Sequence, residues 1–203
     1  MDRRFVITSL ALASTAALAT GAIAQSNSMA GNSMAGNSME GHDMSAMSMG
    51  DAEMKHAMDT QMVGAMSLAG SRAAVKMASS EDVKEFATFE VAEQETVADI
   101  LASLKMPADE AQGALMVPSD DEVMAMLDDD SKAMIEEMMG MSGKEFDMSY
   151  VTAQTDGHEK LLQIQEDYLK TGNNREHLSI AKLARGMIKE HLEHLADLKA
   201  MMA

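Results

Sequence analysis

The chain has 203 residues, no cysteine, no tryptophan and a formal net charge of −17. Such an acidic protein repels nucleic acid and anionic lipid surfaces, and the lack of cysteine excludes disulfides, thiol redox chemistry and thiolate metal sites. Aromatic residues make up only 3% of the sequence, which argues against a base-stacking surface. We therefore expect a protein that attracts cations and is stabilised by packing alone.

Residues 1–24 are predicted to be a cleavable signal peptide. Arg3 and Arg4 form a positive n-region, an apolar stretch follows, and the run Ala22-Ile23-Ala24 supplies the small-x-small cleavage site. Cleavage after Ala24 predicts a periplasmic protein and leaves association with the outer membrane open. The paired arginines leave both the general secretory and the twin-arginine export routes open. No stretch is long and apolar enough to predict a transmembrane helix.

Residues 25–50 form a low-complexity segment rich in Ser, Gly, Asn and Met, which predicts disorder. The unit SMAGN occurs twice, starting at Ser28 and Ser33. Thioether sulfur is a soft, neutral donor that suits Cu(I) and Ag(I). A spacer and an oxidant sink, in which methionine sulfoxide forms and is repaired, are alternative roles for the segment. The predicted ligands of this N-terminal metal site are His42, Met44, Met47, Met49, Met54, His56 and Met58.

Residues 51–203 show the periodicity of amphipathic helices. The first long helix is predicted from about residue 51 to a break at residues 79–80. Its methionines at positions 54, 58, 62 and 66 share one face, for which packing in the core is favoured over a row of metal ligands. The second long helix runs to about residue 104, where Pro107 follows closely and stops it.

Two short helices are predicted before the third long helix. The first opens at a capping box of Ser119 and Glu122, and the next covers residues 131–139. A second capping box, Ser142 with Glu145, opens the third long helix. The fourth follows a break at residues 172–174. Because no alternating strand pattern is present, the sequence predicts an all-α four-helix bundle.

Several short motifs of the helical region resemble a known family. They are Val83-Lys84-Glu85-Phe86-Ala87 followed by Glu93-Gln94, Phe146-Asp147-x-x-Tyr150-Val151 with His158 eight residues beyond Tyr150, and Glu190-His191-Leu192. Over roughly residues 62–198 the chain resembles exported bacterial proteins of unknown function that are often called predicted outer-membrane proteins. The resemblance implies export and a ferritin-like helical domain, and it implies no established chemistry. The family usually has His after an acidic residue in the second helix, where this chain has Gln94.

A polar patch at the bundle centre is a second candidate metal site. The Glu-x-x-His motif of ferritin-like di-iron proteins is absent, because Thr155 and Ile188 stand three residues before the two histidines. The alternative is that these polar residues are hydrogen-bonded within the bundle or lie on solvated faces. A mononuclear site remains available from Glu90, Glu93, His158 and His191.

The sequence thus predicts a non-enzymatic periplasmic protein that binds Cu(I) or Ag(I) through its Met/His-rich N-terminal segment. Copper is the only cofactor predicted, and nucleic acid is not a predicted partner. A second hypothesis is a structural or stress-related envelope protein whose bundle binds an unidentified protein. A third is a metal-dependent oxidase in the bundle. Motifs for serine nucleophiles, phosphate loops, covalent haem and HExxH zinc sites are absent from the sequence.

Overall fold

The computed structural model describes residues 49–110 and 112–203, and these ranges contain helices and connections without a strand. The predicted signal peptide, residues 1–24, lies outside the described residues, as does nearly all of the segment 25–50 that was predicted to be disordered. His42, Met44 and Met47 fall in this part as well. Among the described helices, none combines the length and the apolar character that a membrane crossing requires.

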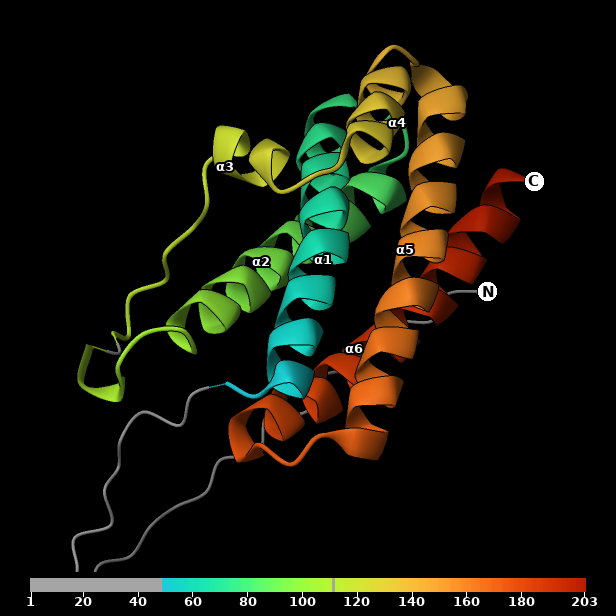
Figure 1. Ribbon diagram of the computed structural model, residues 1–203. Coiled ribbons are helices and arrows are strands. Elements are labelled where there is room, and N and C mark those ends of the chain that lie inside the picture. Colours follow the sequence, from blue (N-terminus) through green and yellow to red (C-terminus); the bar gives the residue numbers. More distant parts are fainter. Residues whose placement is uncertain (1–48, 111) are drawn as a thin grey trace, which may run out of the picture. The chain divides into compact units, whose positions relative to one another are not determined.

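Four long helices form the bundle, and Figure 1 shows their arrangement. They are α1 (Asp51–Met77), α2 (Glu81–Ser103), α5 (Gly143–Thr171) and α6 (Arg175–Met202). Helix α1 packs against α2 and α5, and α5 packs against α6. The connection between α2 and α5 holds the 3-10 turn η1 (Ala108–Glu110) and the short helices α3 (Asp120–Ala125) and α4 (Asp129–Met139). The predicted all-α bundle of four long helices, with extra short helices between the second and third long ones, is therefore confirmed for the described residues.

Side-chain caps fix where several helices begin. Ser119 and Glu122 form the predicted capping box of α3. Asp128 accepts a hydrogen bond from the Ser131 amide and starts α4 at Asp129, which is earlier than the predicted start. The predicted box at the start of α5 is wrong, because Ser142 makes no side-chain cap. Gly143 instead has a φ of 61°, a conformation that glycine adopts without strain.

The apolar core lies mainly around the turn between α1 and α2. Phe86 and Tyr150 meet there edge to face, with ring centroids 6.3 Å apart, an arrangement that aromatic quadrupoles favour. A smaller apolar cluster of Leu161, Ala184 and Ile188 joins α5 to α6. The largest side chains of the main core are Leu68, Val83, Phe86, Val123, Leu127, Ile135, Met138, Phe146, Tyr150, Val151, Leu195 and Leu198.

The methionine row of α1 faces solvent. Met54, Met58 and Met62 are 45%, 60% and 45% exposed, so the prediction that they pack in the core is wrong. Only Met66 packs, partly buried, against the main core. Small and polar residues take the buried face instead, and they leave room for side chains from the neighbouring helices: a Cβ added at Gly64 would lie 2.6 Å from Oε1 of Gln94.

Candidate metal centre

Polar side chains occupy buried positions with the 3–4 spacing that apolar residues usually fill in a bundle. Helix α1 contributes Ser67 and Ser71 to this polar seam, α2 contributes Glu90 and Gln94, and α5 contributes Gln154. A buried polar group is costly unless it finds a partner. The polar seam is therefore stable only if its members find hydrogen-bond or ion-pair partners. Its other buried polar members are Glu53, His56, Thr60, Asp147, His158, Gln165 and His177.

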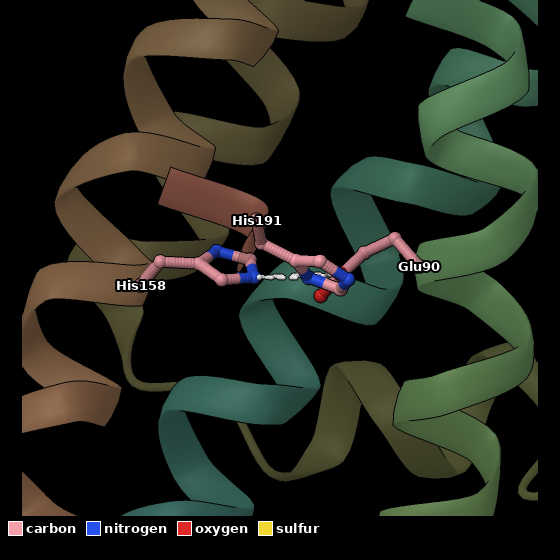
Figure 2. Close-up of side chains that lie close together, drawn as sticks. All are labelled: Glu90, His158 and His191. Atoms are coloured by element: carbon pink, nitrogen blue, oxygen red, sulfur yellow. Dashed lines mark hydrogen bonds and ion pairs between the residues drawn. The ribbon is translucent and has the colours of Figure 1, made fainter. Parts of the chain in front are cut away.

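Glu90, His158 and His191 converge from three different helices (Figure 2). Oε2 of Glu90 lies 3.0 Å from Nδ1 of His191 and 3.4 Å from Nε2 of His158. The two imidazole nitrogens are 3.1 Å apart. Glu90 is fully buried and the side chains of His158 and His191 are 1% and 12% exposed. One carboxylate oxygen and two imidazole nitrogens thus form a compact triangle inside the bundle.

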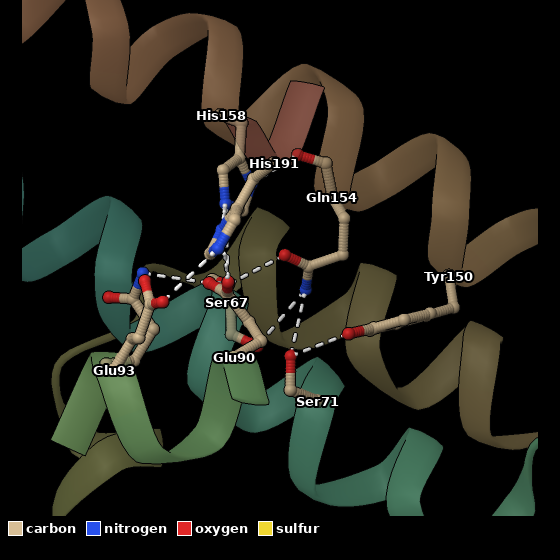
Figure 3. Close-up of polar contacts among 9 residues, drawn as sticks. Ser67, Ser71, Glu90, Glu93, Tyr150, Gln154, His158 and His191 are labelled. Carbon is tan, nitrogen blue, oxygen red and sulfur yellow. Dashed lines mark hydrogen bonds and ion pairs between the residues drawn. The ribbon is translucent and has the colours of Figure 1, made fainter. Parts of the chain in front are cut away.

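Hydrogen bonds hold two members of this triangle in place (Figure 3). Ser67 and Gln94 both donate to Oε1 of Glu90, at 2.6 and 2.8 Å. Nδ1 of His158 lies 2.8 Å from the backbone carbonyl of Gln154, to which its N–H donates. Oε2 of Glu90 and Nε2 of His158 are therefore the atoms left to face each other. Metal-binding histidines characteristically donate their second N–H to a carbonyl or carboxylate in this way.

Two further contacts extend the support toward the apolar core. Oε1 of Gln154 lies 2.7 Å from the Ser67 hydroxyl, and its Nε2 lies 3.3 Å from the Ser71 hydroxyl. The Ser71 hydroxyl is 2.9 Å from the phenol of Tyr150. This chain of contacts, drawn in Figure 3, joins α1 to α5 behind the triangle. The packing of α1 against α5 consequently fixes Ser67, and through its hydrogen bond Ser67 fixes the orientation of Glu90.

Oε2 of Glu90 is buried and accepts no hydrogen bond in the described part of the chain. Its contacts with His191 and His158 are ion-pair distances without a well-directed N–H, and a buried carboxylate oxygen without a hydrogen bond is unfavourable. Ligands bound about 2.0–2.1 Å from a tetrahedral metal ion lie about 3.3 Å from one another. The three distances in the triangle, 3.0, 3.1 and 3.4 Å, match that spacing. A metal ion at its centre would satisfy Oε2 and both imidazole nitrogens.

Glu93 lies at the solvent side of the triangle. Its Oε1 is 3.3 Å from Nε2 of His191. Burial lowers the pKa of His191, but the neighbouring carboxylates of Glu90 and Glu93 outweigh this effect and raise the pKa to about 10. Burial raises the pKa of Glu90, but the two adjacent imidazoles and the Ser67 hydroxyl lower it far below its usual range. In the metal-free protein the triangle therefore holds an imidazolium–carboxylate pair.

Two openings border the triangle. A cavity of ≈ 20 Å³ is lined by His158 and His191 together with Thr60, Gln94 and Gln165; about 10–15 Å³ is enough for one water molecule. A groove of ≈ 540 Å³ between α2 and α6 is lined by Glu93 and His191 and opens to solvent. The triangle therefore has room for a fourth ligand beside it and a route by which an ion can arrive.

The structure divides the predicted ligands into separate groups. Of the bundle set, Glu90, His158 and His191 meet, and Glu93 contacts only His191. Among the described residues of the N-terminal set, Met54 and Met58 are exposed on α1, whereas His56 is 2% exposed and turns into the bundle. Met49, half-buried, precedes the helix. The remaining predicted ligands, His42, Met44 and Met47, lie outside the described residues.

Residues that support the triangle were not predicted from the sequence. Ser67, Ser71 and Gln154 are common polar residues, and buried helix faces are predicted from apolar residues, so these three were missed. Their positions do carry a signal, because each continues the spacing of a buried stripe along its own helix. Gln94 also follows Glu90 by one helical turn, which places its amide beside the carboxylate.

Comparison with known proteins identifies a family and no characterised relative. Residues 38–198 match a family model described as Domain of unknown function (DUF4142). No curated protein and no solved structure matches the chain. The match includes all three members of the triangle. The family description carries no statement about their chemistry.

Proposed function

The chain belongs to the family described as Domain of unknown function (DUF4142), and from this premise we propose that it is a non-enzymatic, exported protein that binds a divalent transition-metal ion. Glu90, His158 and His191 are the proposed ligands. The proposed compartment is the periplasm, which the leader-like pattern of residues 1–24 supports. The role of the protein is then to capture or buffer a metal ion in the cell envelope.

One observation carries this proposal: the buried Oε2 of Glu90 accepts no hydrogen bond while two imidazole nitrogens lie 3.0 and 3.4 Å from it. An ordinary buried ion pair would normally satisfy this oxygen with a well-directed N–H. The second N–H of His158 is already given to the Gln154 carbonyl, which is the arrangement of a metal ligand.

The donor set indicates the class of metal. Two imidazoles and one carboxylate suit zinc, ferrous iron and other divalent first-row ions, and they do not suit calcium or magnesium, which take oxygen ligands only. Three protein ligands also leave one coordination position for water. The ≈ 20 Å³ cavity beside His158 and His191 gives that water a place.

Zinc titration of the metal-free mature protein tests this assignment. We expect one tightly bound ion per chain by competition with a chromophoric chelator. His191→Gln should weaken binding at least about 100-fold, because loss of a ligand costs more than loss of a supporting hydrogen bond, which already costs about 10–100-fold.

His194→Gln is the matched control for this titration. His194 lies one turn from His191 on α6 and is exposed, outside the triangle. The control should bind zinc like the unmodified protein. Equal affinity of His191→Gln and the unmodified protein would overturn the assignment, and equal losses in the two variants would show that zinc binds to surface histidines instead.

Soft-metal capture by the N-terminal segment is a second candidate function, and Cu(I) or Ag(I) is the proposed bound ion. The exposure of Met54 and Met58 favours it, because their thioethers are available to an ion rather than committed to the core. His56 no longer belongs to this set, since it is buried in the bundle. If the segment binds no metal, the spacer and oxidant-sink roles remain, within a structural or stress-related envelope protein.

A combined variant tests the second candidate. Replacing Met44, Met47, Met49, Met54 and Met58 by leucine should weaken Cu(I) binding at least about tenfold, because leucine keeps the apolar character but offers no donor atom. Competition with a chromophoric Cu(I) chelator measures the change. The control replaces Met134, Met139 and Met201, which are also exposed. If both variants lose Cu(I) affinity equally, the N-terminal methionines have no special role.

A further inference from the structure

The groove of ≈ 540 Å³ between α2 and α6 continues beyond the triangle along both helices. Its lining residues on α2 fall between positions 82 and 93, and those on α6 fall between positions 190 and 201. Each of these two walls is about 18 Å long, given the rise of an α-helix, and this corresponds to about three helical turns. The groove is therefore long enough to hold a further helix.

Each wall presents one continuous face of its helix. The lining positions on α2 include 82, 85, 89 and 93, and those on α6 include 190, 194, 197 and 201, a spacing of three and four. Helix α2 packs on α1 and α6 packs on α5, whereas these two faces border the groove. In a helix bundle such a face normally packs against the ridges of a neighbouring helix. The groove thus separates two helix faces that have room for a helical partner.

Apolar side chains contribute to both walls of the groove. Phe86 and Leu198 are buried, which places them at its base. Phe89 and Met201 line it as well and are 61% and 64% exposed. Single exposed apolar residues are ordinary, but large ones that border one hollow from two sides are typical of a surface that is covered on binding. These side chains favour an occupant with an apolar face of its own.

The charge of the groove selects for a cationic occupant. Neither lysine nor arginine is among the described residues that line it, whereas five carboxylates are: Asp82, Glu85, Glu93, Glu190 and Asp197. Within the described part of the chain, Glu93 contacts His191 and none of the other four pairs with a lysine or arginine. Complementary charge speeds association and excludes partners of like charge. A second copy of this chain, with a net charge of −17, would bring the same carboxylates into a symmetric contact.

We propose that the groove docks a cationic amphipathic helix of a partner protein. Its apolar side chains would cover Phe89 and Met201, and its Lys or Arg side chains would lie over the flanking carboxylates. Helices commonly bind proteins in this way, by laying an apolar face into a groove. A small polyamine would leave the apolar walls uncovered, and an uncharged ligand would leave the carboxylates without partners. Glu90 and His158 do not line the groove, so the proposal stands whether or not the triangle binds a metal ion.

Titration calorimetry with a designed peptide tests the proposal. The probe has about 18 leucine and lysine residues, enough to form a helix, with its leucines at a spacing of three and four. The control peptide has the same residues in alternating order, which removes the apolar helix face. With the metal-free mature chain in EDTA, we expect one probe peptide per chain and an affinity at least about tenfold higher than that of the control, because apolar anchors supply most of the binding energy.

An apolar substitution locates the peptide in the groove. Phe89→Ala should weaken binding of the probe peptide at least about tenfold, because exposed aromatic anchors are typical hot spots. The matched control is Leu183→Ala, which removes a side chain that is 70% exposed on α6 but does not line the groove. Its affinity should stay unchanged. Both positions are exposed, so neither substitution is expected to impair folding.

A charge substitution tests the carboxylates separately. Glu190→Gln combined with Asp197→Asn should weaken binding of the probe peptide at least about threefold at low salt, and the loss should shrink at high salt. The matched control, Glu136→Gln combined with Asp156→Asn, removes the same charge at exposed positions outside the groove. It should have a smaller effect, because its carboxylates lie away from the proposed contact.

Four results would overturn the proposal. Equal affinity for the two peptides, or binding of spermine as tight as that of the probe peptide, would show that charge alone is recognised. Equal losses in Phe89→Ala and Leu183→Ala would place the peptide outside the groove. Self-association of the chain alone, measured by analytical ultracentrifugation and abolished by Phe89→Ala, would show that a second copy fills the groove instead.

Discussion

Asp147→Ala should lower the free energy of unfolding by about 4 kcal/mol. The Asp147 carboxylate, on α5 and 1% exposed, accepts hydrogen bonds from the amide and hydroxyl of Ser79, at 2.9 and 2.5 Å, and from the amide of Ser80, at 2.9 Å. Alanine removes three hydrogen bonds to a charged acceptor, each of which contributes about 1.5–3 kcal/mol, and water can replace part of this at Ser79, which is exposed. Urea denaturation followed by circular dichroism measures the loss.

Asp156→Ala is the control for this prediction. Asp156 lies on the same helix but is exposed, and substitutions at such positions usually change stability by less than about 0.5 kcal/mol. A similar loss of stability in both variants would contradict this account, because it would not arise from the hydrogen bonds of Asp147 to the α1–α2 turn. Asn at position 147 should be milder than Ala, since its amide oxygen can still accept one of the bonds.

Glu90→Gln should destabilise the metal-free protein by about 3 kcal/mol near pH 6. Glu90 is fully buried and forms the negative half of the pair with His191. Removing one partner of a buried pair leaves the other charge uncompensated, at a cost of about 3–5 kcal/mol. Glu93 still faces His191 in the variant, which places the expected loss at the lower end. Denaturation in the presence of EDTA measures it, and Glu85→Gln, an exposed position on the same helix, should have little effect.

The difference in the free energy of unfolding between the unmodified protein and Glu90→Gln should decrease both at high pH and at low pH. The folded-state pKa of His191 is raised to about 10, so the stabilisation from its charge is complete below about pH 6.5 and is lost as the pH rises toward 10. The pKa of Glu90 is lowered from 4.5, so its contribution is present above that value and is lost as the pH falls. A stability difference that stays constant from pH 4 to pH 10 would contradict this account.

Helix positions could be predicted from the sequence because local signals agree with the fold. Ser119 with Glu122 opens α3 as predicted, and the break at residues 79–80 separates α1 from α2. The start of α5 was missed because a Ser-x-x-Glu pattern does not show whether the serine can reach the amide, and here Gly143 sets the turn. The inward face of α1 was missed because hydrophobicity ranks methionine above serine and threonine, whereas the partner helices select small and polar residues there.

Part of the candidate site could also be predicted. Glu90, Glu93, His158 and His191 were singled out by type and helical position, although their convergence depends on how α2, α5 and α6 are placed in space. His177 was missed, yet it continues the inward row of α6 that includes Ala181, Ala184, Ile188 and His191 with alternating spacings of four and three. Tertiary packing alone brings His177 to His56, where their Nδ1 atoms are 3.2 Å apart, so no local pattern reveals that contact.

The hydrogen bonds across α1 and α5 also decide how these helices are aligned along their length. Glu53 pairs with Tyr168, Thr60 with Gln165 and Ser71 with Tyr150, in an antiparallel order. Interchangeable apolar contacts tolerate sliding by a heptad, whereas a slid α1 would leave each of these donors and acceptors buried and unmatched. The polar interior therefore admits one alignment of α1 with α5. It sets the position of His158 on α5 relative to Ser67, which donates a hydrogen bond to Glu90, before any ion arrives.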